Sequence, residues 1–465
     1  MGRVIVLLLL VASSVHLQAQ SNIGSDIIEA KLIYFTNIAE EDSVIFYSEL
    51  AEKKNLFTNQ GYISVGDFHL FKKHYATALK YYDKALANNH YNPLLHYYMN
   101  VCYGYLGMYD QKHFISKYYN EKQVEYYQYK KNKLEYLSYF GGTLASNNLS
   151  KNAAIDITNG SNFFGAIDRT GSLYFNYLSA QYRFKSRFTL LGSINYNTIH
   201  GNQQFNYEYF IGTPPQRVDT AYKIKLSDYK VIQPIGYLQL AYISHKNLKL
   251  KFSYGVTNTR YTLLSASPLE AHRDTFTTET TNHFECTVGL MLQYRKPHYQ
   301  IDVRGFVMPF SKLALLPIPT LSDSDRTQAD LSLTYFPLST NIVSVKAQAS
   351  VCNTQNTFAK LVYTFEVNAQ VYKKLWLNVQ YQRNNLKNFI DLEGAVVYNI
   401  DDVINSKIAA RFTYYMNQHL ELAFQYGFMN RTGNYQSLLS PGKLLQTTEY
   451  KYSNQIINGG VKWNF

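Results

Sequence analysis

The strongest constraint on the fold is an alternation of apolar and polar side chains that continues to the last residue. Val461, Trp463 and Phe465 occupy every second position of the final stretch, with Lys462 and Asn464 between them. This period of two is typical of a β-strand whose two faces meet different surroundings. Since the ends of most domains fray, a strand that reaches the final residue is expected to pair with another strand.

The same period runs through the chain from about residue 134 onwards. In the stretch LKLKFSYGV, Leu248, Leu250 and Phe252 alternate with Lys249 and Lys251. Short connections are predicted near residues 185–186, 245–246, 296–297, 339–340, 373 and 417–418. Longer ones are predicted near residues 147–170, 200–228, 265–281, 311–328 and 431–450, and less certain ones near 353–357 and 386–404. About 14 strands lie between these connections, within a range of about 12–16, and both ends of the sheet lie on the short-turn side.

Two fold classes share this alternation, a transmembrane β-barrel and a soluble β-sandwich. Short turns on one side and long loops on the other are typical of the barrel. The polar face is rich in Asn, Gln, Ser, Thr and Gly, as a hydrated lumen would be. The 44 Tyr and 27 Phe recur towards strand ends, as in the aromatic girdles of membrane barrels. We therefore predict an antiparallel transmembrane β-barrel over residues 134–465.

Barrel closure supplies the partner of the final strand. A closed barrel leaves no free edge, so the final strand should pair with the first, near residues 134–144. Val461, Trp463 and Phe465 would then face lipid. The ending resembles the C-terminal signature of outer-membrane barrels, a terminal aromatic residue with apolar residues at alternate positions. The resemblance implies outer-membrane lipid and the barrel-assembly machinery as partners.

The first 20 residues have the pattern of a secretory signal peptide. Arg3 is followed by an apolar run over residues 4–11 and by a polar end at Gln18, Ala19 and Gln20. The run is too short to span a membrane, and no later stretch has about 18 consecutive apolar residues. The polar end resembles signal peptides of the Bacteroidota, which implies a Gram-negative envelope. The 3 Cys are too scattered for a disulfide framework.

Residues 25–133 have a helical period instead, with Tyr, Leu and Ala at every third or fourth position. A pattern within them recurs after about 34 residues, the period of a tetratricopeptide repeat. Small residues would lie where the two helices of a unit touch, and Tyr side chains would fill the space around them. The residues at these positions are Tyr62, Gly66, Tyr75, Ala78, Tyr82, Ala85, Tyr103, Gly107 and Tyr109. The second unit departs from the pattern at Asn100 and Lys112. We predict a tetratricopeptide-like domain, with a generic helical bundle as the alternative.

By alternation, a set of charged residues should point into the barrel lumen. These candidates are Lys249, Lys251, Glu285, Arg295, Asp302, Arg304, Lys346, Glu366, Arg411, Glu421 and Lys462. Charge inside a barrel costs little where water fills the lumen or where opposite charges pair. The mixed signs favour paired networks that narrow the lumen, whereas the slight cationic excess would suit an anionic solute. Both interpretations stay open.

No catalytic or metal-binding set emerges from the sequence. The 12 His have no metal-ligand spacing, and there is no nucleophile elbow. We therefore expect no enzyme activity, no metal and no cofactor. His200, His272 and His283, near predicted loops, are interpreted as solvated residues.

Two acidic segments are interpreted as solvated loops. Their acidic residues are Asp323, Asp325 and Asp330 in the first, and Asp391, Glu393, Asp401 and Asp402 in the second. The first could offer oxygen ligands to a calcium ion, but it lacks the Gly and the terminal Glu of an EF-hand loop. A Tyr- and Lys-rich helix is predicted over residues 115–137. It is interpreted as a solvating cap that packs on the last repeat and rests at the membrane interface. The alternative is a binding surface whose Tyr side chains stack on sugar rings and whose Lys side chains attract an acidic polymer.

Helical repeats joined to an outer-membrane barrel resemble bacterial exopolysaccharide exporters and YaiO-type barrel proteins of the Bacteroidota. The resemblance implies that the helical domain lies in the periplasm and recruits a protein partner, while the barrel passes or anchors an exported polysaccharide or protein. Two alternatives are a structural subunit of an envelope secretion or assembly complex with a plugged barrel, and an enzyme at the barrel rim. The net charge of +12 comes without a dense Lys/Arg cluster, so no nucleic-acid partner is expected. An anionic polymer remains a candidate partner.

Overall fold

The computed structural model describes residues 24–88, 92–119, 121–126, 133–146, 164–211, 219–266, 276–308, 326–354, 357–386, 389–391, 393, 396–397, 403–438 and 445–465. The chain divides into two compact units, residues 1–130 and 131–465, called here the helical unit and the barrel unit. The predicted signal peptide over residues 1–20 lies outside the described residues.

The helical unit consists of short helices with recognisable ends. They are α2 (Ser25–Asn37), α3 (Glu41–Lys54), α4 (Asn59–Phe71), α5 (Tyr75–Asn88), α6 (Pro93–Tyr105), α7 (Tyr109–Ile115), the 3-10 turn η1 (Ser116–Tyr118) and α8 (Glu121–Tyr126). The Thr58 hydroxyl accepts a hydrogen bond from the Gly61 amide at 3.0 Å at the start of α4. Asn92 caps α6 in the same way, with Pro93 at the first helical position. None of the described helices is long and apolar enough to cross a membrane.

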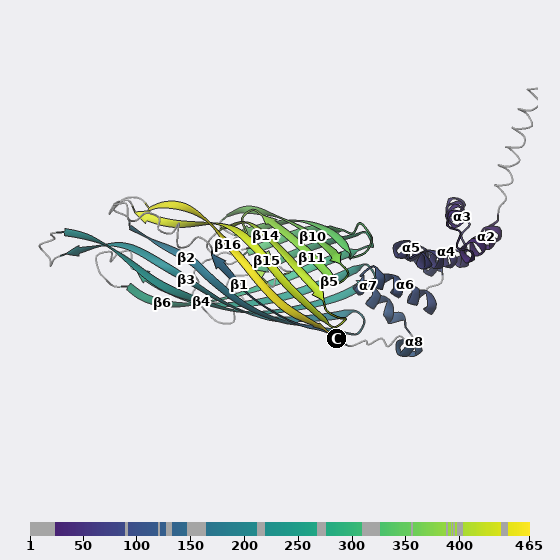
Figure 1. Ribbon diagram of the computed structural model, residues 1–465, viewed down its shortest axis with the longest axis horizontal. Helices are drawn as coiled ribbons and strands as arrows, with labels where there is room; N and C mark the ends of the chain where they lie inside the picture. The colour runs from purple at the N-terminus through teal and green to yellow at the C-terminus, as the bar shows by residue number, and fades with distance from the viewer. Residues whose placement is uncertain are drawn as a thin grey trace, which may run out of the picture. The chain divides into compact units, whose positions relative to one another are not determined.

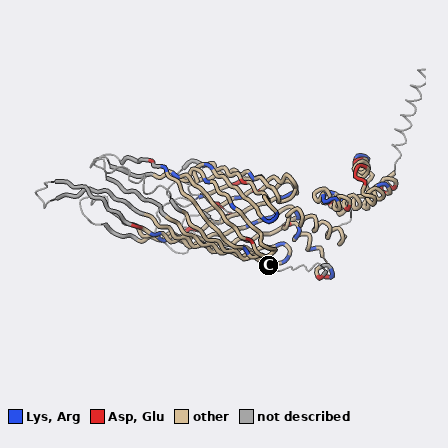
Figure 2. Tube along the Cα trace, in the orientation of Figure 1, with Lys and Arg blue, Asp and Glu red and all other residues tan. Residues whose placement is uncertain are grey.

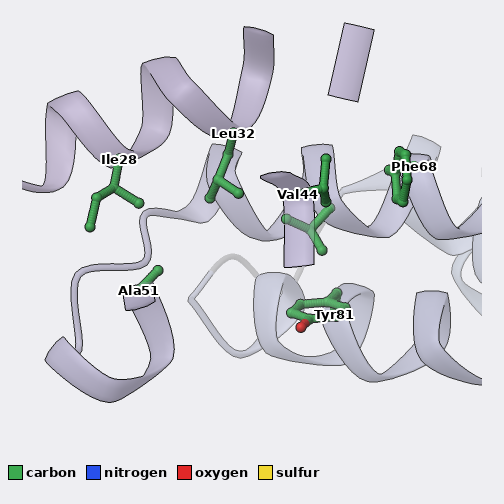
Figure 3. Packing of buried hydrophobic residues seen from close by; sticks show 7 residues of the cluster. Ile28, Leu32, Val44, Ala51, Phe68 and Tyr81 are labelled. Carbon is green, nitrogen blue, oxygen red and sulfur yellow. The ribbon is translucent and has the colours of Figure 1, made fainter. Parts of the chain in front are cut away.

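The helical unit has its own apolar core (Figure 3). The core residues come from α2, α3, α4 and α5 and are Ile28, Leu32, Val44, Ala51, Val65, Phe68 and Tyr81. Burial of each large aliphatic or aromatic side chain contributes about 1.5–3 kcal/mol. The first four helices are therefore held together by their own packing.

The predicted repeat positions include the most buried residues of this unit. Ala78, Tyr82 and Ala85 are completely buried. Gly66 lies so close to the Tyr82 ring that a side chain at this position would overlap the ring. Tyr82 also donates a hydrogen bond to Asp67 at 2.7 Å. The small residues therefore stand where α4 and α5 approach each other.

The remaining repeat positions differ in their surroundings. Tyr62 is partly buried, Tyr103 is buried and Gly107 has a positive φ of 67° in the turn after α6. Tyr75 stacks on Tyr105 of the next helix pair, with ring centroids 4.5 Å apart. Tyr109, the counterpart of Tyr75 in the second pair, is 60% exposed, because the described chain supplies no further pair after α7.

The single helix predicted over residues 115–137 is wrong. The chain forms η1, passes through an extended Tyr119 (φ −70°, ψ 132°) and forms the short α8. From Lys133 it is already in the first strand. The strand alternation of Leu134 and its successors overrides the helical spacing of the preceding Tyr residues.

We expect the helical unit to lose stability in mild acid. His69 is buried against the Tyr81 ring at 5.7 Å, and its Nδ1 has no hydrogen-bond partner. Burial, with a smaller contribution from His74, lowers the pKa of His69 from 6.5 to about 4. The unfolded chain therefore binds a proton below about pH 6.5 that the folded chain refuses until about pH 4. The contribution is complete above pH 6.5 and is lost as the pH falls towards 4, by up to about 3 kcal/mol.

The measurement is thermal unfolding of the full chain, followed by helix ellipticity between pH 7.5 and 4.5. His69→Phe keeps the ring stack and removes the titrating group, so its profile should be flatter than that of the wild type. Burial raises the pKa of Asp67, which acts in the opposite direction, so the difference between the two proteins is the decisive quantity. Equal slopes would contradict the assignment to His69.

The barrel unit is a closed antiparallel barrel of 14 strands in the described part of the chain (Figure 1). Its strands are β1 (Lys133–Ser146), β2 (Phe164–Phe184), β3 (Phe188–Ile211), β4 (Asp219–His245), β5 (Leu248–Ala266), β6 (Phe276–Arg295), β7 (Tyr299–Met308), β8 (Arg326–Tyr335), β9 (Val343–Thr354), β10 (Thr357–Tyr372), β11 (Leu375–Arg383), β14 (Val403–Tyr415), β15 (Leu420–Leu438) and β16 (Leu445–Asn464). A separate two-stranded sheet joins β12 (Ile390–Asp391) to β13 (Val396–Val397). The predicted barrel and its strand number are confirmed.

The first and last strands close the barrel, as predicted. β1 pairs with β16 in a register that sets Tyr136 opposite Asn464 and Phe140 opposite Gly460. Gly460 has no room for a side chain, because a Cβ there would overlap the Phe140 ring and the Tyr139 carbonyl oxygen. The backbone of β16 therefore passes directly beneath an aromatic ring at the seam.

The wall presents an apolar outer face and a polar inner face. In β8, buried and exposed residues alternate at every position. Leu331 and Leu333 are 57% and 51% exposed, whereas Ser332 between them is 1% exposed. Val461, Trp463 and Phe465 likewise lie on the exposed face. Charged residues are scattered thinly along the described wall (Figure 2), which suits an outer face in contact with lipid.

The short turns lie where they were predicted, but several long connections are shorter than expected. β3 and β4 pair as far as Ile211 and Asp219, so most of the loop predicted over residues 200–228 is a hairpin. β15 and β16 pair as far as Leu438 and Leu445 in the same way. Beyond the lipid-facing band a strand needs only its ladder of hydrogen bonds, so its hydrophobic alternation fades and the sequence resembles a loop.

Candidate functional site

The connection between β11 and β14 enters the barrel lumen. β11 and β14 are neighbours that pair up to Arg383 and Ser406, so a short turn would suffice to join them. The chain instead inserts residues 384–402. The described residues of this insertion, 384–386, 389–391, 393 and 396–397, are called here the lumen segment. An insertion that is not needed to connect two strands is a candidate for a functional element.

The first half of the lumen segment is anchored by apolar packing. Leu386 and Phe389 are 0% and 1% exposed. They belong to a cluster with inward-facing residues of β9, β10, β14 and β15, namely Cys352, Val362, Ile404 and Met429. Each buried side chain contributes about 1.5–3 kcal/mol. This part of the segment is therefore a fixed part of the barrel interior.

Polar contacts continue the attachment at the next residues. The Gln328 amide of β8 donates to the Ile390 carbonyl oxygen at 2.8 Å and accepts from the Ile390 amide at 2.9 Å. Asp391 accepts a hydrogen bond from Gln382 at 3.2 Å and lies 3.6 Å from the Lys407 ammonium. Gln328 thus acts as a strand partner for the segment, because one side chain satisfies both backbone groups of Ile390.

Glu393 ends the crossing with a set of polar contacts on the far wall. Its carboxylate lies 2.7 and 2.9 Å from the Lys251 ammonium and accepts a hydrogen bond from Gln239 at 2.6 Å. Its carbonyl oxygen accepts from the Tyr237 hydroxyl at 3.1 Å. Glu393 has a φ of 60°, a left-handed conformation that costs a residue with a side chain roughly 1–2 kcal/mol.

The lumen segment spans the barrel from wall to wall. The strand order from β11 runs β10, β9, β8, β7, β6, β5, β4. β4 is thus the seventh strand from β11 in a ring of 14, which is the opposite side. The segment leaves the wall at β11 and is held by Gln239 of β4 and Lys251 of β5. A barrel of this size would otherwise enclose a wider lumen.

The other charges of the lumen are largely paired between wall strands. Arg304 and Asp330 lie 3.3 Å apart, and Glu421 accepts a hydrogen bond from Lys462 at 3.1 Å. Further wall pairs are Arg183–Glu135 at 3.2 Å, Arg326–Glu285 at 3.8 Å and Lys346–Glu366 at 3.9 Å. Such pairs satisfy charges that would be costly to bury alone.

The rest of the predicted lumen residues also lie on the inner face. Asp302 accepts hydrogen bonds from Gln293 and Gln300, each at 3.0 Å. The Arg295 guanidinium donates to Asn341 at 2.6 Å and stacks over the Phe336 ring, and that of Arg411 stacks over Phe140. Lys249 lies two residues before Lys251 on the same face of β5.

The interpretation of the acidic segments as solvated loops is wrong for three residues. Asp391 and Glu393 hold the lumen segment, and Asp330 lies within β8 with its side chain paired to Arg304. Asp323, Asp325, Asp401 and Asp402 lie outside the described residues. One sequence signal was available, because Cys352, Val362, Ile404 and Met429 are apolar residues at inward positions and so require something apolar inside the barrel.

No group of His, Cys, Asp and Glu side chains within the described residues is arranged to hold a metal ion. His283 bonds Tyr261 through its Nε2 at 2.7 Å and stacks on that ring. His200 lies edge-on to Tyr174 at 6.2 Å. His272 lies outside the described residues. The lumen segment with its partners on the wall is therefore the site with the most specific geometry.

No protein-family model matches the chain, and no curated protein matches it. Among solved structures, it is similar to the toluene transporter TodX of Pseudomonas putida, with 10% identity, a TM-score of 0.42 and coverage of 74% of this chain and 92% of that one. It is similar to the Ralstonia pickettii toluene transporter TbuX, with 10% identity, a TM-score of 0.42 and coverage of 72% and 90%. It is also similar to a Pseudomonas aeruginosa FadL homologue, with 8% identity, a TM-score of 0.39 and coverage of 71% and 90%. Likenesses this distant say nothing about what the chain carries.

Proposed function

We propose that the protein is an outer-membrane channel that passes a solute or an exported product through a lumen obstructed by its own lumen segment. The observation that carries the proposal is this segment, which crosses a closed barrel from β11 to β4 and is held at its far end by polar contacts alone among the described residues. A barrel that served only as a membrane anchor would need no such segment, because fixed side chains of the wall can fill its lumen. A segment that ends on an exchangeable ion pair suits a passage that opens.

The outer wall supports placement in a membrane. Leu, Val, Phe and Tyr side chains dominate the exposed face of the strands, and a closed barrel satisfies all of its backbone groups without water. The export signal predicted at the N-terminus and the terminal strand favour the outer membrane. The helical unit precedes the first strand on the short-turn side, which favours a periplasmic position.

The helical unit is proposed to bind a periplasmic partner. Its close contact of Gly66 with Tyr82 and its stacking of Tyr75 on Tyr105 support tetratricopeptide-like packing. Repeats of this kind commonly present an extended surface to another protein. Phe71, Tyr105 and Tyr109 are 76%, 63% and 60% exposed, and exposed aromatic residues are enriched at binding surfaces.

The test is single-channel conductance of the purified protein in a planar bilayer, with and without residues 25–130. We expect small, brief conductance in the full chain, because the lumen segment occupies the path. The truncated form should insert and conduct in the same way while losing its periplasmic partner in pull-down experiments. Failure of the truncated form to insert would contradict the division into two units. Absence of conductance in both forms would favour a plugged structural subunit instead.

A further inference from the structure

The polar residues that hold Glu393 form a built binding site on the barrel wall. Tyr237 and Gln239 occupy alternate positions of β4, and Lys251 lies on β5 opposite Ala241. Tyr237 and Gln239 are 6% and 7% exposed. Gln239 donates to the Tyr237 hydroxyl at 2.9 Å as well as to Glu393. These donors are fixed by two paired strands close to their shared turn, so they are preorganised whatever occupies the site.

The occupant, in contrast, belongs to a connection. Glu393 reaches the site from a segment whose apolar anchor ends at Phe389 and whose next contacts with the wall are the hydrogen bonds of Ile390 to Gln328. Among the described residues beyond Asp391, its contacts with the wall are polar, and its backbone is in the left-handed region. Another carboxylate can replace that of Glu393 at little net cost in free energy, because it forms the same hydrogen bonds with the wall. The donors on the wall strands therefore stay in place, whereas the carboxylate that they bind can be replaced.

We infer that Lys251, Gln239 and Tyr237 form a carboxylate-binding site for the transported solute, and that Glu393 occupies it in the closed barrel as an internal substitute for the solute carboxylate. The inference rests on the proposed channel function and adds the class of its cargo. Both Glu393 oxygens face the Lys251 ammonium and one also accepts from Gln239. A planar group with two oxygens matches this arrangement.

The charge balance of the lumen points the same way. The lumen segment supplies the carboxylates that pair with Lys251 and Lys407. Displacement of Glu393 leaves Lys251 facing the passage, whereas Asp391 stays with the anchored part of the segment. Arg431 on the inner face of β15 is 2% exposed, and two of its guanidinium nitrogens have no hydrogen-bond partner in the described structure. An opened lumen is therefore cationic and suits an anionic cargo.

The test measures binding of ¹³C-acetate to the full chain in detergent by line broadening of the acetate signal. Glu393→Gly empties the site and suits the positive φ of this position. Because the tethered carboxylate no longer competes, this variant should bind acetate at least about tenfold more tightly than the wild type. Glu393→Gln removes the charge with little change of shape and should shift the affinity in the same direction.

Lys251→Met in the Glu393→Gly background should abolish the gain. Lys462→Met is the matched control, because Lys462 pairs with Glu421 of the wall and not with the segment, and it should keep the gain. Equal acetate binding by the wild type and both Glu393 variants would overturn the inference, as would displacement of acetate by an equal concentration of inorganic phosphate. The readout needs no ion flow, so it fails or succeeds independently of the conductance test.

Discussion

Replacing residues 385–402 with a short Gly-Ser turn is expected to turn a barrel with brief openings into a steady channel of severalfold higher conductance. β11 and β14 already pair up to Arg383 and Ser406, so their ends can be joined without the lumen segment. The removal opens the space between β11 and β4 and takes away the carboxylates that face Lys251 and Lys407. The enlarged channel should therefore prefer anions over cations.

The measurement is single-channel current in a planar bilayer, with reversal potentials under a salt gradient. The control places the same turn between Ile211 and Asp219, which pair at the tip of the β3–β4 hairpin, and its conductance should stay at the wild-type level. A second variant replaces only residues 392–402, because it keeps Leu386 and Phe389 over the apolar wall. If both variants assemble and neither conducts more than the wild type, the segment does not obstruct a passage.

Gly460→Val is expected to prevent most of the protein from assembling into a folded barrel. The added side chain would overlap the Phe140 ring and the Tyr139 carbonyl oxygen across the β1–β16 seam. Overpacking in a well-packed interior typically costs about 1–3 kcal/mol. At the seam the consequence is larger, since a barrel that does not close exposes two strand edges to lipid.

The assay compares the heat-modifiable folded band of the variant on a gel with that of the wild type after membrane extraction. Gly192→Val is the matched control, because Gly192 is also a strand glycine but has open space where its Cβ would lie. The control should assemble like the wild type. Normal assembly of Gly460→Val would show that the seam tolerates a different register or ring position.

The sequence predicted the wall of the barrel well and its interior only in part. The alternation of Val461, Trp463 and Phe465 led directly to the pairing of the last strand with the first. The same alternation set Asp302 and Arg304 on the inner face. It did not show that Glu393 meets Lys251, since 142 residues separate them along the chain.

The acidic composition of the lumen segment was misleading for a physical reason. Asp391 and Glu393 resemble solvated loop residues, because a carboxylate paired inside a hydrated lumen and one in bulk water have the same local sequence. Their roles depend on Lys407 and Lys251, which the strand order brings near them. The useful local signal lay elsewhere, in apolar residues such as Val362 and Ile404 at positions that should have been polar.

The sequence by itself determined the number of strands, the short turns between them, the alternation of side chains between the two faces of the wall and the helical character of the first region. These follow from periods of two and of three to four residues, which depend only on neighbours along the chain. The tertiary structure alone decided that the lumen segment leaves the wall at β11 and that Glu393 occupies a site on the opposite wall. That choice depends on contacts between strands on opposite sides of the barrel, which become neighbours only when the barrel closes.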